Sequence, residues 1–145
     1  MAESTEVELV GLGASTVIPE EISIEQVWKV LLIKIQQPNL FLPVTDVVTR
    51  PSDDGKGTYR EMSLGPNRRI SENIYFDESK LEVKFVVADD IIEHVNIIHT
   101  NATNGERTLE FYKRHSQTGE RTPWDVPKSV CLTAQARMFE IARTV

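Results

Sequence analysis

The stretch "RRISENIYFDESKLEVKFV", residues 68–86, decides the fold, because it reads as two strands joined by a short turn. In its first strand, the carboxylate of Glu72 shares one face with three apolar residues at alternate positions, Ile70, Ile74 and Phe76. In its second strand, an apolar face is formed by Leu81, Val83, Phe85 and Val87. The connection "DES" is too short for a parallel crossover, so the pair is predicted to be an antiparallel hairpin.

Similar alternating patterns surround this hairpin on both sides. A first strand is expected within residues 7–16, bent by Gly11 and Gly13. Short breaks such as "GPNR" and "TNGE" separate the strands, which predicts one antiparallel sheet of seven strands. The other six are placed near 44–50, 58–64, 69–76, 80–88, 91–101 and 107–114.

Two amphipathic helices flank the strands. Ser23 and Gln26 match an S-x-x-Q capping box, and apolar residues then recur at spacings of three and four until Pro38. A last helix is predicted from about Pro127 to residue 144, with an apolar stripe of Cys131, Ala134, Met138, Ile141 and Val145. This order of elements predicts an α+β fold whose curved sheet grips the C-terminal helix around an internal cavity.

Composition narrows the class of function. The 145 residues are expected to form a single domain, 1–145, with a core of ordinary size. A net charge of −6 with scattered basic residues disfavours nucleic acid as a partner. No apolar run is long enough to span a membrane, and the acidic start "MAESTEVELV" does not resemble a secretory signal. We therefore expect a cytoplasmic protein that acts away from membranes.

The sequence lacks the usual signatures of metal and cofactor chemistry. Cys131 is the only cysteine, which rules out an internal disulfide and a cysteine-based zinc site. Gly11 and Gly13 do not complete a phosphate-binding loop. His94 and His99 belong to one predicted strand but point to opposite faces, so they do not form a metal site. Any catalysis is therefore expected to need neither a metal nor a cofactor.

These patterns resemble the START-like, birch-pollen-allergen-like (SRPBCC) superfamily. Within it, the chain is similar to a small fungal and bacterial subfamily that includes proteins of secondary-metabolite clusters. The resemblance spans roughly residues 14–144 and rests on "SIEQVWKVLLIKIQQPNLFLP", "RRISENIYFDESKLEVKFV" and "HVNIIHTNATNGERTLEFYKRH". It implies a helix-grip fold whose cavity binds apolar small molecules. Superfamily members include polyketide cyclases and other cofactor-free catalysts, and also proteins that only carry or sense a ligand.

Glu72 is the principal candidate for chemistry. The "GPNR" turn is expected to place Leu64 near Ile70, which sets Met62 opposite Glu72 and Arg60 one diagonal step away. A buried carboxylate is costly unless it is paired or hydrogen-bonded. Glu72, held by Arg60, is then a general base or the anchor of a polar ligand group. The alternatives are a structural ion pair and a strand end at which Glu72 reaches water.

The strand after the "DD" turn has two alternative faces. If that turn has two residues, His94 and Asn96 face inward with Phe85; if it has three, Glu93 and His99 face inward instead. An inward His94 would suit proton transfer, and Asn96 could orient a ligand. The sequence leaves both alternatives open.

Two functions from different classes follow. The first is a cofactor-independent enzyme of specialised metabolism, of cyclase or isomerase type, with Glu72, Arg60 and His94 as catalytic groups. The second is a non-catalytic carrier or sensor. Both predict an apolar small molecule as the partner, and both leave a monomer or a homodimer open. The expected ligand-binding residues are Met62, Phe85, Asn96, Trp124 and Met138, with Trp124 either closing the cavity or packing at the start of the last helix.

Overall fold

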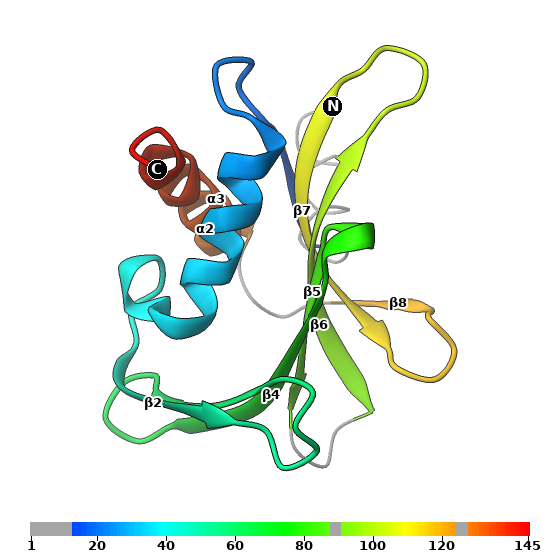
Figure 1. The fold of residues 1–145 in the computed structure, drawn as a ribbon. Coiled ribbons are helices and arrows are strands. Elements are labelled where there is room, and N and C mark those ends of the chain that lie inside the picture. Colours follow the sequence, from blue (N-terminus) through cyan, green and yellow to red (C-terminus); the bar gives the residue numbers. More distant parts are fainter. Residues whose placement is uncertain (1–12, 88–90, 124–127) are drawn as a thin grey trace.

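The computed structural model describes residues 13–87, 91–123 and 128–145. One curved antiparallel sheet surrounds two helices, α2 and α3, which lie side by side on its concave side (Figure 1). The strand order is β1-β7-β6-β5-β4-β3-β2, and a short strand β8 pairs with β7. This α+β arrangement confirms the predicted helix-grip fold.

The strands from β2 to β7 follow one another across the sheet, because each turn returns the chain beside the strand it has just left. β1 closes the other edge by pairing with β7. The six predicted strands are confirmed with bounds that shift by no more than a few residues. Their bounds are β2 Thr45–Pro51, β3 Thr58–Ser63, β4 Arg69–Asp77, β5 Glu82–Val87, β6 Ile92–Thr100 and β7 Arg107–His115.

Two strands differ from the expectation. β1 covers Ala14–Val17, later than the predicted 7–16, of which residues 7–12 lie outside the described part of the chain. Gly13 precedes it with a φ of +105°, and a Cβ there would meet the carbonyl oxygen of Phe111 at 2.2 Å. Only glycine allows that close approach between β1 and β7. β8, Arg121–Thr122, was not predicted, because two residues carry no alternation signal.

The predicted "DES" turn is a 3₁₀ turn, η2, over Glu78–Lys80. Asp77 begins it by accepting a hydrogen bond from the backbone N–H of Ser79 at 3.0 Å. Leu81 then adopts a left-handed conformation with a φ of 54°, so β5 begins one residue later, at Glu82. Leu81 therefore precedes the strand to which it was assigned, but it still packs against the core, where Val83 and Phe85 are buried.

Helix α2 covers Ile24–Gln36, as predicted. The capping box is present: the side chain of Ser23 accepts from the N–H of Gln26 at 3.1 Å, and that of Gln26 accepts from the N–H of Ser23 at 2.7 Å. The helix ends before Pro38, which opens the 3₁₀ turn η1, Pro38–Leu40. Local signals therefore determine both ends of this helix.

Helix α3 is described over Lys128–Ala142, so its expected start at Pro127 lies outside the described residues. Cys131, Ala134 and Met138 of the predicted stripe are buried. Gln135 is fully buried among them, donating to the carbonyl oxygen of Ala14 at 3.0 Å and accepting from the hydroxyl of Thr16 at 2.5 Å. These two bonds tie α3 to the edge strand β1.

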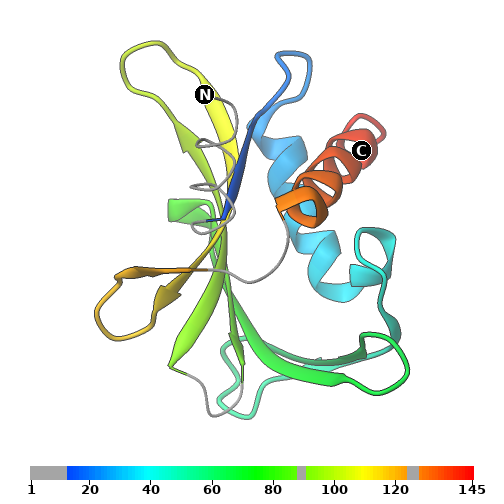
Figure 2. The same ribbon diagram turned by 180° about the vertical axis from the view of Figure 1, so that it is seen from behind.

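The core lies between the sheet and both helices (Figure 2). The sequence assigned the cover of the sheet to the last helix, but α2 shares this role. One helix is too narrow to cover the apolar face of so many strands. The core combines residues of α2, α3 and the concave face of the sheet, among them Val27, Leu31, Ile74, Phe85, Phe111, Met138 and Phe139.

Candidate functional site

The register between β3 and β4 sets the first pair of the site. Arg60 lies directly opposite Glu72, and Met62 lies opposite Ile70. The predicted register was therefore wrong by two residues. The backbone N–H of Leu64 donates to the carbonyl oxygen of Arg68 at 2.8 Å, so the turn is tighter than the "GPNR" pattern suggested and every later pair shifts accordingly. This shift improves the pairing of Arg60 with Glu72.

Glu72 and Arg60 form a buried ion pair on the concave face. Nη2 of Arg60 donates to Oε1 of Glu72, and the side chains of Arg60 and Glu72 are only 2% and 5% exposed, respectively. Nη1 of Arg60 donates to two carbonyl oxygens in the last turn of α2, those of Lys34 at 2.9 Å and Ile35 at 3.1 Å. Carbonyl groups of a last helical turn have no partner within the helix. Arg60 therefore joins the sheet carboxylate to the end of α2.

Lys34 is a second buried cation, which the sequence patterns had not singled out. It is 5% exposed, and its Nζ donates to Oδ1 of Asn96 at 2.8 Å. The same nitrogen lies 4.4 Å from the ring centre of Phe111 and 5.3 Å from that of Phe85. The signal was present in the sequence, because Lys34 follows Leu31 by three residues on the apolar stripe of the helix. Together, Lys34, Arg60, Glu72 and Asn96 form the inner cluster.

The electrostatic environment of the inner cluster favours a neutral lysine. Burial lowers the pKa of Lys34 from 10.5 to about 7, and the positive charge of Arg60 adds to this effect. Glu72 and Cys131 oppose it only in part. Within the described part of the chain, the cluster holds two cationic side chains and one carboxylate. Burial is the main reason why the ammonium form of Lys34 is disfavoured, and the positive charge of Arg60 is the second.

Two buried side-chain N–H groups, one in the inner cluster and one elsewhere on α2, have no hydrogen-bond partner among the described residues. They are Nε of Arg60 and Nε1 of Trp28. Trp28 lies on α2 and contacts Phe76 of β4 edge to face, with ring centres 6.0 Å apart. A buried N–H without a partner costs roughly 1–3 kcal/mol. Unused donors of this kind are common where a ligand or an ordered water completes a site.

The register of β6 settles which of its faces looks inward. His94 pairs with Phe85 and Asn96 pairs with Val83, so the first of the two alternatives is right. Asn96 is buried in the inner cluster. His94 is two residues before it on the same face of β6 and is partly buried. Glu93 lies on the opposite, convex face. The turn before β6 lies partly outside the described residues.

The other predicted ligand-binding residues have different outcomes. Met62, Phe85 and Met138 are buried in the core, at 6%, 5% and 0% exposure. Phe85 lies beside both cations, since the guanidinium carbon of Arg60 is 5.5 Å from its ring centre. Trp124 lies outside the described residues. The catalytic roles given to Glu72, Arg60 and His94 stay predictions.

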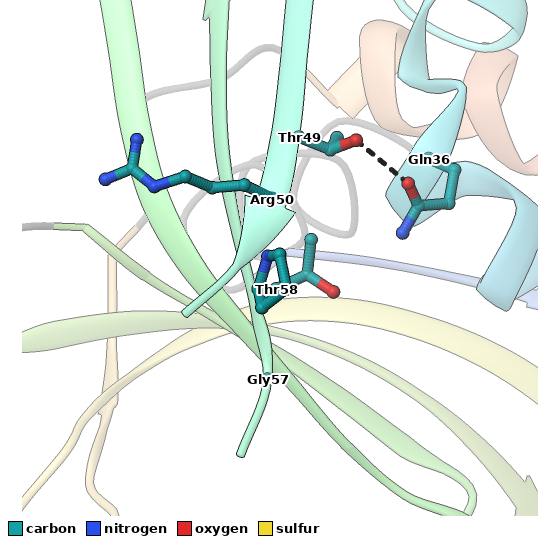
Figure 3. Close-up of a pocket in the computed structure, with 6 residues that line it drawn as sticks. Gln36, Thr49, Arg50, Gly57 and Thr58 are labelled. Atoms are coloured by element: carbon teal, nitrogen blue, oxygen red, sulfur yellow. Dashed lines mark hydrogen bonds between the residues drawn. The ribbon is translucent and has the colours of Figure 1, made fainter. Parts of the chain in front are cut away.

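A hollow of about 330 Å³ opens between the end of α2 and strands β2 and β3 (Figure 3). The side chain of Thr49 points to Gln36 and donates to it at 3.0 Å, while Arg50 points away (Figure 3). Thr49 pairs with Arg60 across the strands, but Arg60 and Glu72 are not among the residues that line the hollow. A second hollow, of about 300 Å³, lies at the far end of the sheet near Val17. The predicted internal cavity therefore stays a prediction.

The described residues contain neither a metal-binding group of His, Cys, Asp or Glu side chains nor a helix that could cross a membrane. Among residues 13–87, 91–123 and 128–145, no group of three or more His, Cys, Asp or Glu side chains could hold a metal ion. No helix in these ranges is both long enough and apolar enough to cross a membrane.

Solved structures with the same fold share little sequence with this chain. The protein TTHA0849 from Thermus thermophilus is 11% identical, with a TM-score of 0.59, and the match covers 92% of this chain and 97% of that protein. The di-domain ARO/CYC StfQ from the steffimycin biosynthetic pathway is 9% identical, with a TM-score of 0.60. That match covers 98% of this chain but 54% of StfQ, so the chain spans about half of it. Ara h 8.0201 is 14% identical, with a TM-score of 0.54 and coverage of 90% and 93%.

These likenesses confirm the START-like, birch-pollen-allergen-like (SRPBCC) fold that the sequence patterns resemble. A comparison with curated proteins found no match. The family model "AtaL: Acetylaranotin biosynthesis cluster protein L" matches residues 15–127, which include all four members of the inner cluster and most of the sheet. The chain therefore belongs to the acetylaranotin biosynthesis cluster protein L (AtaL) family.

Proposed function

We propose that this protein is a cofactor-independent enzyme of cyclase or isomerase type that acts on a mostly apolar intermediate of specialised metabolism. One observation carries the proposal: the inner cluster places a carboxylate, a guanidinium, an amine and an amide together in an otherwise apolar core. Family membership supports a role in a biosynthetic cluster. The fold shared with StfQ, an ARO/CYC of the steffimycin pathway, supports a cyclase-type reaction.

Three of the four groups, those of Glu72, Arg60 and Lys34, divide the chemistry of proton transfer next to a carbonyl group. Glu72 acts as the general base that takes a proton from carbon. Arg60, through its charge, and the amine of Lys34, as a hydrogen-bond donor, stabilise the negative charge that then develops on the carbonyl oxygen. The rings of Phe85 and Phe111 form apolar walls that position the substrate. His94 is a candidate to return the proton, because it shares the concave face.

The alternative is a non-catalytic carrier or sensor of an apolar ligand. The hydrogen bonds of Arg60 favour it, because this residue already serves Glu72 and two carbonyl groups of α2. In that case the ion pair stabilises the junction of helix and sheet, and a ligand is bound but not converted. Both functions require a ligand in the interior, so conversion is the property that separates them.

Gene deletion and complementation test the proposal. Small-molecule extracts are compared after deletion of the gene and after complementation with wild-type, Glu72→Gln or Glu82→Gln protein. Glu82 is the matched control, since it is a carboxylate on the convex face of the same sheet. We expect Glu72→Gln to lower product formation by a factor of about 10² or more, and Glu82→Gln to restore the wild-type level. Full product formation with Glu72→Gln would exclude Glu72 as the base.

The double variant Arg60→Met, Glu72→Gln separates chemistry from stability. If Glu72 takes part in the reaction, this variant regains folding stability but not product formation. If the pair is only structural, it regains both. For a carrier, native mass spectrometry of the wild-type protein would detect a bound small molecule of unchanged mass after incubation.

A further inference from the structure

Lys34 has an environment unlike that of an ordinary helix lysine. Its amine lies in the core, where Oδ1 of Asn96 accepts one of its hydrogen bonds at 2.8 Å. Two aromatic rings lie near it: the centre of the Phe111 ring is 4.4 Å from Nζ, and that of the Phe85 ring is 5.3 Å from Nζ. Lysine side chains almost never lie fully inside a protein without a counter-charge. In this protein the nearby carboxylate, Glu72, already binds Arg60.

Burial and a neighbouring cation are the two conditions that make a lysine amine nucleophilic. Lys34 meets both. It is buried, and the guanidinium carbon of Arg60 lies 5.5 Å from the centre of the Phe85 ring, which is also 5.3 Å from Nζ of Lys34. Both effects lower its pKa to about 7, so a large share of the amine is neutral in neutral solution. A neutral amine carries the free electron pair that attack on a carbonyl carbon requires.

We propose that Lys34 is a nucleophile that forms an imine with a ketone or aldehyde group of an apolar ligand. This inference deepens the proposed function and rests on its assumption that a ligand occupies the interior at the inner cluster. It narrows the ligand class to carbonyl compounds. Neither the family description nor the fold assigns a role to this lysine.

The condensation balances without any further reactant. Nζ of Lys34 bonds to the carbonyl carbon, and the carbonyl oxygen leaves as water together with the two hydrogens of the amine. The product is an imine, which becomes a cation when it binds a proton and is then stabilised by the aromatic rings beside it. Addition of water reverses every step and restores both the amine and the carbonyl group. Asn96 positions the amine by accepting its N–H.

The charge balance of the inner cluster also suits a different ligand, an apolar carboxylate bound to protonated Lys34. That ligand would form an ion pair with the amine but no covalent bond. We favour the imine because burial of Nζ and the nearby charge of Arg60 disfavour the ammonium form that an ion pair needs. The carboxylate is therefore an outcome that the test must be able to detect.

Acetylacetone, a small β-diketone, is the probe. It condenses with a neutral amine to a conjugated enaminone, which intact-mass spectrometry detects as a gain of one acetylacetone minus one water. We expect one adduct per chain, located on Lys34 by peptide mapping. The labelling rate should rise about tenfold per pH unit below pH 7 and level off above it, since only the neutral amine reacts.

Matched variants make the test specific. Lys34→Arg keeps a positive charge but cannot form the imine, so it should abolish the adduct. Lys29→Arg changes an exposed lysine of the same helix and should leave the adduct unchanged. Because wild-type labelling is located by peptide mapping, the result stands even if Lys34→Arg folds poorly.

Three results would overturn the inference. The first is labelling that is spread over exposed lysines, and the second is no labelling at all. The third is that acetylacetone displaces a fatty acid, added beforehand as the apolar carboxylate, without forming a covalent adduct. The complementation experiment is independent of this one. If Lys34 is not labelled but Glu72→Gln abolishes product formation, the imine fails and the proposed enzyme stands. If Lys34 is labelled but Glu72→Gln is fully active, Lys34 is reactive and the proton-transfer role of Glu72 fails.

Discussion

The two faces of this sheet carry charged clusters of opposite balance. On the concave face, the inner cluster combines two cations with one carboxylate and is buried. On the convex face, Arg114 binds two carboxylates, Glu93 at 2.7 Å and Glu82 at 3.2 Å, and is 21% exposed. We call these three residues the outer cluster.

The two clusters shift the pKa values of Arg114 and Lys34 in opposite directions. Burial by itself would lower the pKa of Arg114, but its hydrogen bonds with Glu82 and Glu93 more than offset this and raise the pKa. Lys34 lacks such compensation, so burial prevails and its pKa falls. The cation of the outer cluster is thus paired with two carboxylates, whereas the inner cluster holds one more cation than carboxylates in the core. This excess is why we assign function to the concave face.

The largest effect is expected at Lys34. Unfolding returns the pKa of this lysine from about 7 to its ordinary value of 10.5, so between these values the unfolded chain binds more protons. Wild-type stability should therefore rise with pH across this window, and the full cost of the buried charge should apply below pH 7. Relative to Lys34→Met, the change between pH 6 and pH 10 should reach up to about 4 kcal/mol.

Urea unfolding of wild-type protein and Lys34→Met at several pH values measures this change. Lys29→Met is the matched control for the loss of one positive charge from α2. A stability difference between wild type and Lys34→Met that is the same at every pH would show that Lys34 keeps its ordinary pKa in the folded protein. The contrast between the clusters would then rest on burial alone.

A smaller effect is expected at the ion pair. Glu72→Gln leaves the guanidinium of Arg60 buried without a counter-charge and should reduce the free energy of unfolding by about 3 kcal/mol. Gln keeps one acceptor, which places the loss at the lower end for a broken buried pair. Adding Arg60→Met should recover much of this loss. Thermal and urea unfolding measure both variants, and an unchanged melting temperature in Glu72→Gln would contradict the buried pair.

The smallest effect is expected in the outer cluster. Glu82→Gln should reduce stability by less than about 1 kcal/mol, because Arg114 retains Glu93 and the cluster is partly exposed to water. Added salt should shrink this loss further, whereas the loss in Glu72→Gln should change little. Urea unfolding at low and high salt provides the measurement. A loss in Glu82→Gln as large as that in Glu72→Gln would remove the distinction between the two clusters.

The sequence by itself determined most of the elements and their order, but not the two-residue strand β8. Strict alternation across Ile70, Glu72 and Ile74 identified a strand with a carboxylate on its inner face, and this face is set by local geometry alone. The capping box at Ser23 and the break at Pro38 set the ends of α2 for the same reason. These signals involve residues that are a few positions apart, so they can be recognised in the sequence without reference to the rest of the chain.

Only the tertiary structure decided which polar groups meet. The partner of Glu72 depends on the length of a turn, and a shift of two residues exchanged Met62 for Arg60. Lys34 and Asn96 are 62 residues apart in the chain, and they meet because α2 packs onto the concave face. A lysine on an apolar stripe can also extend its amine to solvent. Whether Lys34 does so depends on the cover that α3 and the sheet provide, which no local pattern encodes.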